Sequence, residues 1–201
     1  SEMCIRDRWN GGVDEAGIWD PIKGVRKISM RKNFDFHDVI GISPSGQIVG
    51  SCTKEEPEIS YGWVSDSGSE ARVLPNGPGI ENVARYANAS GDIYGWRFGL
   101  DRRYSVQMWH SGQRYEDLGH PASGGVYVTG LNNRGDLNLA PGTSGVPDDV
   151  RWADGRWQAL DSPPGLNEEW SNECISDEGW VFGTGAISEV GHAVFWRPGF
   201  G

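Results

Sequence analysis

The sequence predicts an all-β fold: a β-propeller-like array of four-stranded antiparallel blades, with about 44 residues per repeat. Two series of residues recur with this one period, and no segment carries a sustained helical period of apolar residues. A single sheet of four short strands cannot bury both of its faces, so such sheets must stack on their neighbours. We therefore expect almost no helix and a core that is formed between blades.

The first series consists of tryptophans, which are separated by 44, 46, 43 and 44 residues. Its members are Trp19, Trp63, Trp109, Trp152 and Trp196. An indole side chain can bury about 150–250 Å². We expect each recurring tryptophan to lie on the third strand of its repeat and to be covered by the sheet beside it.

The second series consists of glycines that end a tight turn, Gly46, Gly91, Gly135 and Gly179. Each follows a triplet that starts with Ser or Asn, as expected where a short polar side chain caps the turn and glycine takes the left-handed position. The turn joins an apolar strand, here called strand a, to strand b; strand c carries the tryptophan and strand d ends the repeat. A further glycine late in strand b is expected to let a neighbouring sheet or ring approach closely; these residues are Gly50, Gly95 and Gly183.

These series divide a single domain, residues 9–201, into repeats. Three repeats are complete and two are partial, and the first begins at strand c. The array can therefore be an incomplete or open ring as readily as a closed one. The expected repeats are 9–34 (partial), 35–80, 81–124, 125–168 and 169–201 (partial).

The first eight residues are interpreted differently. The run from Met3 to Asp7 resembles translated sequencing-adapter sequence, so residues 1–8 are expected to be a non-native tail outside the fold. Setting Cys4 aside leaves Cys52 and Cys174, which are too few and too far apart for a disulfide framework or a zinc site. Both are expected to be buried free thiols.

Three short motifs carry a family resemblance. Ile42 to Gly50 and Leu131 to Gly135 are similar to an Ile-Asn-x-x-Gly-x-Val-x-Gly core, and Gly191 to Trp196 is similar to a Gly-His-Ala-Phe-x-Trp strand in which Val194 displaces the Phe by one place. On these motifs, residues 9–201 resemble the HAF-type extracellular repeat proteins of bacteria. The resemblance implies a propeller-like array in an exported protein, extracellular or in the cell envelope, with no characterised catalysis.

Composition excludes two classes of partner. Lys plus Arg number 18 and Asp plus Glu 28, which gives a net charge of −10 and a pI near 4.8. This is the wrong sign for a surface that tracks nucleic-acid phosphates. No apolar run approaches the roughly 18 residues of a membrane-spanning helix. Nothing in the sequence calls for a cofactor or a metal.

Candidate binding residues lie in the loops from strand b to strand c and from strand d to the next strand a, which differ between repeats and should share one face. Trp96, Arg97, Arg102 and Arg103 form a basic aromatic loop. This loop could stack on a sugar or hold a carboxylate, or could be an ordinary solvated loop. The acidic candidates could ligate calcium, but they lack EF-hand spacing and are more typical of solvated loops. The candidates are Trp96, Arg97, Arg102, Arg103, Asp148, Asp149, Glu168, Glu169 and Trp170.

The sequence thus predicts a non-catalytic interaction or surface scaffold whose ligand is a protein or a glycan. A lectin-like propeller is the first alternative and requires Trp96 and Trp170 to be exposed. A propeller glycoside hydrolase is the second alternative, because paired carboxylates could come from different blades. The four histidines fall at different places in their repeats and no recognisable nucleophile motif accompanies them, so no catalytic residue is assigned.

Overall fold

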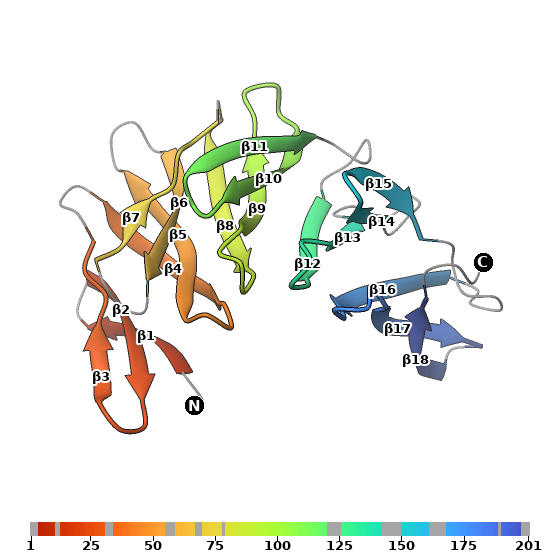
Figure 1. Ribbon diagram of the computed structural model, residues 1–201, viewed down its shortest axis with the longest axis horizontal. Coiled ribbons are helices and arrows are strands. Elements are labelled where there is room, and N and C mark those ends of the chain that lie inside the picture. The colour runs from red at the N-terminus through yellow and green to blue at the C-terminus, as the bar shows by residue number, and fades with distance from the viewer. Residues whose placement is uncertain are drawn as a thin grey trace. The chain divides into compact units, whose positions relative to one another are not determined.

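The computed structural model describes residues 4–10, 13–30, 34–54, 59–66, 70–77, 79–119, 126–141, 150–160, 168–188 and 190–197. Every regular element in these ranges is a β-strand, so the expected all-β class is confirmed (Figure 1). The chain divides into two compact units, Ser1–Leu118 and Gly119–Gly201, where the sequence predicted one domain. Each unit is described by itself.

The first unit contains three sheets, called blades 1 to 3, in which neighbouring strands follow chain order. Blade 1 is formed by β1 (Cys4–Asn10), β2 (Val13–Asp20) and β3 (Gly24–Lys27). Blade 2 is formed by β4 (Asp35–Ile42), β5 (Gln47–Lys54), β6 (Ile59–Asp66) and β7 (Arg72–Val73). Blade 3 is formed by β8 (Glu81–Ala87), β9 (Ile93–Phe98), β10 (Tyr104–His110) and β11 (Arg114–Gly119).

The second unit contains two sheets, blades 4 and 5. Blade 4 is formed by β12 (Val126–Leu131), β13 (Leu137–Pro141), β14 (Val150–Ala153) and β15 (Arg156–Ala159). Blade 5 is formed by β16 (Glu168–Ile175), β17 (Val181–Ile187) and β18 (Val190–Trp196). The three complete repeats predicted from the sequence each form one four-stranded antiparallel sheet, so the propeller-like blade is confirmed.

The amino-terminal residues differ from the expectation. Residues 1–8 were assigned to a tail outside the fold, whereas β1 pairs antiparallel with β2 from Cys4↔Trp19 to Asn10↔Val13. Blade 1 therefore has the equivalents of strands b, c and d, and not strands c and d alone. The backbone ladder explains this, because it needs N–H and C=O groups in register and no particular side chain.

The turns from strand a to strand b are built alike in blades 2 to 5. In blade 4 the N–H of Gly135 donates to the carbonyl of Asn132, and the Asn132 side chain accepts from the N–H of Asp136. The same two bonds recur in the other three blades with Ser43, Asn88 or Ser176 as the capping residue. All four glycines have φ near +85°, the left-handed conformation that favours glycine. This predicted feature of the repeat is confirmed.

The late glycine of strand b has a different role from the expected one. A Cβ at Gly95 would lie 1.8 Å from the carbonyl oxygen of Val83, and one at Gly183 would lie 1.9 Å from that of Ser171. Both carbonyls belong to strand a of the same blade, close to a shift in strand register. The close approach therefore comes from within the sheet. At Gly50 the ring of Trp63 also comes within 2.7 Å of the position of a Cβ.

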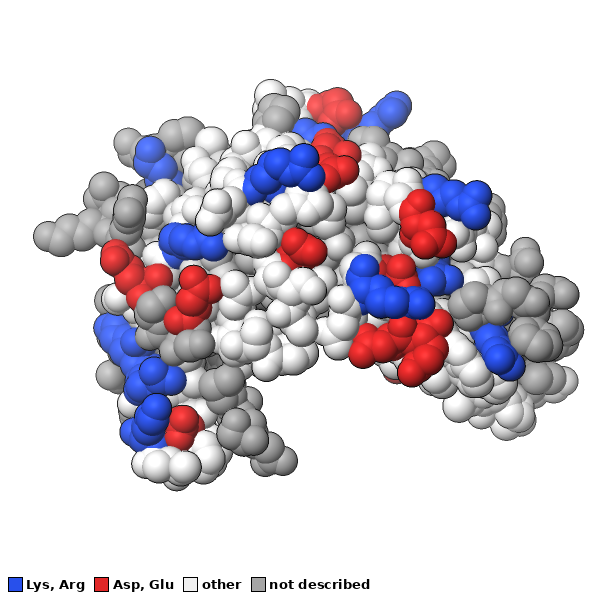
Figure 2. Space-filling view, in the orientation of Figure 1, with Lys and Arg blue, Asp and Glu red and all other residues white. Residues whose placement is uncertain are grey.

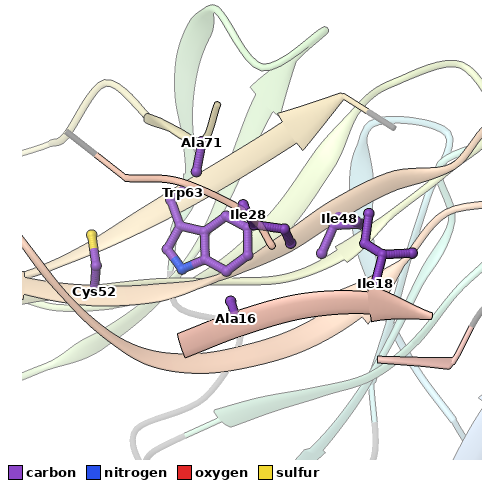
Figure 3. Close-up of a cluster of buried hydrophobic side chains, with 7 residues drawn as sticks. All are labelled: Ala16, Ile18, Ile28, Ile48, Cys52, Trp63 and Ala71. Atoms are coloured by element: carbon purple, nitrogen blue, oxygen red, sulfur yellow. The ribbon is translucent and has the colours of Figure 1, made fainter. Parts of the chain in front are cut away.

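The interior lies between blades, as expected. Trp63 is fully buried in a cluster to which blade 1 contributes Ala16 and Ile18, and the close-up shows these side chains around the indole (Figure 3). Trp109 is fully buried in a second cluster, where Val49 and Val64 of blade 2 meet blade 3. The prediction that a neighbouring sheet covers the indole is therefore confirmed for these two tryptophans.

The other tryptophans of the series are less buried: Trp152 and Trp196 are half-buried and Trp19 is 42% exposed. The series is also not in one register. Trp109, Trp152 and Trp196 each pair with the first apolar residue of strand b, whereas Trp63 pairs two residues further along, with Gly50. This shift accounts for the 46-residue spacing that separates Trp63 from Trp109.

The two thiols differ in environment. Cys52 is buried and free, and burial raises the pKa of its thiol to about 12. Cys174 is free but exposed, because it lies on strand a of blade 5 next to a register shift. The expectation of two buried thiols is therefore wrong for Cys174.

Candidate functional site

The hairpin of β9 and β10 in blade 3 carries four of the predicted binding residues. The sequence suggested a loop from Trp96 to Ser105, but the strands continue through most of it, with Trp96 opposite Val106 and Phe98 opposite Tyr104. The aromatic side chains explain this extension, because they are strong strand formers and pair well across strands. The connection is therefore the short turn of residues 99–103.

This turn is held by its own backbone. The N–H of Gly99 donates to the carbonyl of Arg103 (2.9 Å), and the N–H of Arg102 donates to the carbonyl of Gly99 (3.0 Å). The side chain of Asp101 accepts from the N–H of Arg103 (3.3 Å). Arg102 has a φ of +59°. The result is a fixed turn that presents Leu100, which is 74% exposed, beside the exposed Arg102 and Arg103.

Three half-buried aromatic side chains support the turn from one face of the sheet. The ring of Tyr104 lies 4.8 Å from that of Phe98 and 5.4 Å from that of Trp96, centroid to centroid. The lectin-like alternative required Trp96 to be exposed, and the structure shows it half-buried. Trp96 therefore contributes to the support of the turn.

Arg97 does not join the other predicted arginines. Successive residues of a strand point to opposite faces, so Arg97 lies on the face away from Trp96. Its Nε donates to Ser105 Oγ (2.9 Å), and its guanidinium pairs with Asp117 at 2.6 Å, with only 12% of the side chain exposed. Arg97 thus links β9 to β10 and β11, and its assignment to a ligand-binding loop is corrected.

A neighbouring residue that the sequence analysis missed belongs to the same surface. Ile80 lies in the connection before β8, where its N–H donates to the carbonyl of Phe98 (3.0 Å) and its carbonyl accepts from Ser60 (3.2 Å). Its side chain is exposed. We call Ile80, Leu100, Arg102 and Arg103 the blade-3 tip. Isolated apolar residues in loops carry no periodic signal, which is why Ile80 and Leu100 were not singled out.

The remaining predicted residues contribute less. Asp148 and Asp149 lie outside the described residues. Glu168, Glu169 and Trp170 were placed in a loop, whereas the structure places their backbone in strand β16; their side chains also lie outside what is described. Within the described ranges, no group of three or more His, Cys, Asp or Glu residues is arranged to hold a metal ion. The same ranges contain no helix with the length and hydropathy needed to cross a membrane.

Comparisons with known proteins bear on the fold. No family model and no curated protein matches the chain. Among solved structures, a puromycin hydrolase complexed with PGG is similar with a TM-score of 0.54 and 11% identity over 97% of this chain. YCF48 bound to D1 peptide is similar with a TM-score of 0.50 and 17% identity over 96% of this chain.

This chain spans 42% of the length of the puromycin hydrolase chain and 66% of that of YCF48. Both neighbours are β-propeller proteins. At such low sequence identity, the similarity shows a shared architecture and does not indicate a substrate or a partner. The chain is an all-β, propeller-like protein built from four-stranded antiparallel blades.

Proposed function

We propose that the chain is a non-catalytic binding module that recognises an acidic protein segment through the blade-3 tip. One observation carries the proposal: a fixed turn presents an apolar side chain, Leu100, next to three exposed charged residues, Asp101, Arg102 and Arg103. Arginine is enriched among the side chains that dominate protein interfaces.

The rigidity of the turn favours binding. Ordering a flexible loop opposes association, by about 0.5–1.5 kcal/mol for each side chain that is immobilised. The backbone bonds that join Gly99 to Arg102 and Arg103 already fix this turn in the free protein. The aromatic support from Trp96 and Tyr104 holds the strands beneath it. A partner therefore meets a preformed surface.

The charge of the tip indicates the kind of segment. The whole chain has a net charge of −10, whereas Arg102 and Arg103 lie side by side at this turn. The only carboxylate within the turn, Asp101, is engaged by the backbone N–H of Arg103. Arginine binds carboxylates through strong charge-assisted hydrogen bonds, so the tip favours a segment that combines acidic side chains with an apolar one.

The comparisons support binding in a limited way. YCF48, which has a similar fold, is described as bound to a peptide. The puromycin hydrolase shows that the same architecture also occurs in an enzyme, and no residue of this chain is assigned a step of hydrolysis. The proposal therefore depends on the blade-3 tip and not on either neighbour.

A random peptide library displayed on phage tests the proposal with the intact chain as target. The test variant combines Leu100→Ser, Arg102→Asn and Arg103→Gln; Asn is chosen at position 102 because it tolerates positive φ. Peptides rich in Asp and Glu with an apolar residue should be enriched and should bind the variant at least about tenfold more weakly, a difference of about 1.4 kcal/mol.

The matched control removes two other exposed arginines, with Arg114→Gln and Arg156→Gln. Peptide affinity should be unchanged in this control. Equal affinity for the wild-type chain and the tip variant would contradict the proposal. A glycan array, in which the lectin-like alternative predicts weaker binding after Trp96→Ala, and an assay with chromogenic glycosides check the two alternatives on the same samples.

A further inference from the structure

The sequence contains two Asn-Gly dipeptides, at residues 10–11 and 76–77. An asparagine side chain that precedes glycine is open to attack by the backbone nitrogen of that glycine, because glycine has no side chain to shield the nitrogen. Asparagine is accordingly among the residues that are chemically labile on heating. The two dipeptides lie in different structural settings, and these settings decide which of them reacts.

The first dipeptide begins in a strand. Asn10 lies at the end of the ladder between β1 and β2, where it pairs with Val13. A strand pair holds the backbone dihedrals of its residues in the extended region. Attack on the side chain requires ψ of the asparagine to rotate until the next nitrogen faces the side-chain carbon. The ladder opposes this rotation, so we expect Asn10 to react slowly.

The second dipeptide lies in irregular backbone. Asn76 is exposed and follows the end of β7, in the connection from blade 2 to blade 3. This connection is fixed at Leu74 and at Ile80, whose N–H groups donate to carbonyls of β6 and β9 (2.8 and 3.0 Å). Between these points, Asn76 and Gly77 make no backbone hydrogen bond to any other described residue. No such bond therefore opposes the rotation that brings the reacting atoms together.

We propose that Asn76 is a site of spontaneous deamidation. The nitrogen of Gly77 attacks the side-chain carbon Cγ of Asn76, the bond from Cγ to Nδ2 breaks, and ammonia leaves with the proton of the attacking nitrogen. The product is a cyclic succinimide, which water opens at one of its two carbonyl carbons. Opening at Cγ gives aspartate. Opening at the backbone carbon gives isoaspartate, in which the main chain runs through Cγ.

The packing of blade 3 requires the glycine that makes Asn76 reactive. A Cβ at position 77 would overlap the hydroxyl and the Cζ atom of Tyr115, whose oxygen is buried, so the ring would have to move. Tyr115 packs against the buried cluster that contains Trp109, and the two rings lie 6.5 Å apart, centroid to centroid. A larger residue at position 77 would protect Asn76 only by disturbing this contact.

Isoaspartate at position 76 acts on the contact between blades 2 and 3. It adds one carbon atom to the main chain between Pro75, whose carbonyl accepts from Nε1 of Trp109 at 2.6 Å, and Gly77, which lies against Tyr115. The longer chain displaces at least one of these contacts. The added charge is a smaller change. Figure 2 shows Lys and Arg interspersed with Asp and Glu on one face of the molecule, and exposed charges are screened by water and salt.

Incubation of the intact chain at mildly alkaline pH tests the proposal. Ion-exchange chromatography separates chains that have gained a carboxylate, and labelling with an isoaspartyl methyltransferase followed by peptide mapping locates the altered residue. The labelled peptide should contain residue 76. In Asn76→Gln the side chain would have to form a larger ring, so acidic chains should accumulate at least about tenfold more slowly. Asn10→Gln is the matched control and should accumulate them as the wild-type chain does.

Asn76→Asp separates the charge from the change in the main chain. This variant carries the same carboxylate on a normal backbone, so it should unfold at the same urea concentration as the fresh wild-type chain. The purified isoaspartate form should unfold at a lower concentration. Equal accumulation in the wild-type and Asn76→Gln chains, or label at residue 10 in place of residue 76, would overturn the proposed site. An isoaspartate form as stable as Asn76→Asp would overturn its effect on blades 2 and 3.

Discussion

The contact between blades 2 and 3 and the contact between blades 4 and 5 use the same repeat positions with different chemistry. Val49 of blade 2 and Ala84 of blade 3 belong to one buried apolar cluster. At the equivalent positions, Asn138 of blade 4 donates to Asn172 of blade 5 at 2.7 Å, and both side chains are fully buried. One backbone arrangement therefore accepts either an apolar pair or a pair of amides.

The polar contact continues beyond the amides. Asn172 also donates to the carbonyl of Leu139 (2.8 Å) and accepts from Thr129. Arg151 pairs with Asp136 at 3.0 Å and lies over the ring of Trp196 at 5.8 Å. Among the residues that the structure describes, the side-chain oxygen Oδ1 of Asn138 has no hydrogen-bond partner. The difference teaches that the repeat specifies where blades meet, while individual residues determine how strongly.

Replacement of Trp109 by alanine should give the largest loss. The indole is fully buried and its Nε1 donates to the carbonyl of Pro75 at 2.6 Å. A buried large-to-small change of this kind costs about 3–5 kcal/mol. Urea unfolding followed by far-ultraviolet circular dichroism measures the loss. A cost below about 1 kcal/mol would mean that the apolar contact does not stabilise the first unit.

Asn172→Ala should have an intermediate effect. It leaves Asn138 and the hydroxyl of Thr129 without their shared acceptor, and an unsatisfied buried polar group costs about 1–3 kcal/mol. The double variant Asn138→Val with Asn172→Ala copies the apolar pair of blades 2 and 3. It should recover part of the stability lost in Asn172→Ala in the same urea experiment, because Asn138 no longer lacks its acceptor, while the bonds of Asn172 to Thr129 and to the Leu139 carbonyl stay absent. A double variant that is less stable than Asn172→Ala would show that the two contacts are not interchangeable.

The polar contact should also respond to acid. Burial raises the pKa of Asp136, but hydrogen bonds from Asn132, Arg151 and Arg134 outweigh it and leave the pKa below the ordinary 3.8. A carboxyl whose pKa is lower in the folded state stabilises the fold above its unfolded pKa, and this stabilisation is lost as the pH falls through the folded value.

The unfolding temperature of the second unit should therefore fall as the pH drops below about 4. Asp136→Asn should reduce this dependence on pH. The apolar contact of blades 2 and 3 contains no such pair in its buried cluster, so Trp109→Ala should leave the dependence unchanged. An equal slope in the wild-type and Asp136→Asn chains would show that other carboxyls are responsible.

Trp19→Ala should have the smallest effect on stability. The indole is 42% exposed and its face is not covered by a blade among the described residues. Substitutions at exposed positions usually change stability by about 0.5 kcal/mol or less. Urea unfolding at a concentration where the chain is monomeric measures it. A loss comparable to that of Trp109→Ala would reveal a contact on this face within one chain.

Much of the fold could be predicted because it depends on local chemistry. The a-to-b turns need a capping Ser or Asn and a glycine with positive φ, and these recur in the sequence at a fixed period. The register of Trp63 could not be predicted, because a shift of two residues keeps the side chain on the same face. The pairing of β1 could not be predicted either, since its ladder depends on backbone groups alone.

The candidate site was predictable only in part. Arg102 and Arg103 were identified because two adjacent arginines are conspicuous in an acidic chain. Arg97 was misassigned because the strand extends beyond the expected loop boundary and turns it to the other face, where Asp117 holds it. Ile80 comes from a separate connection and reaches the tip only through its backbone bond to Phe98. A residue such as Ile80 is therefore identified from the folded structure and not from the spacing of residues in the sequence.

The shared a-to-b turn has a consequence for how this protein can change over time. Each turn is closed by hydrogen bonds among its own few residues, and the blade-4 turn adds bonds from Asn132 and Asn133 to the turn of blade 5. Recombination between two such turns would exchange, duplicate or delete one whole repeat, and the order of strands in the blades on either side would be kept. The length of this protein is therefore expected to vary among descendants in steps of one blade.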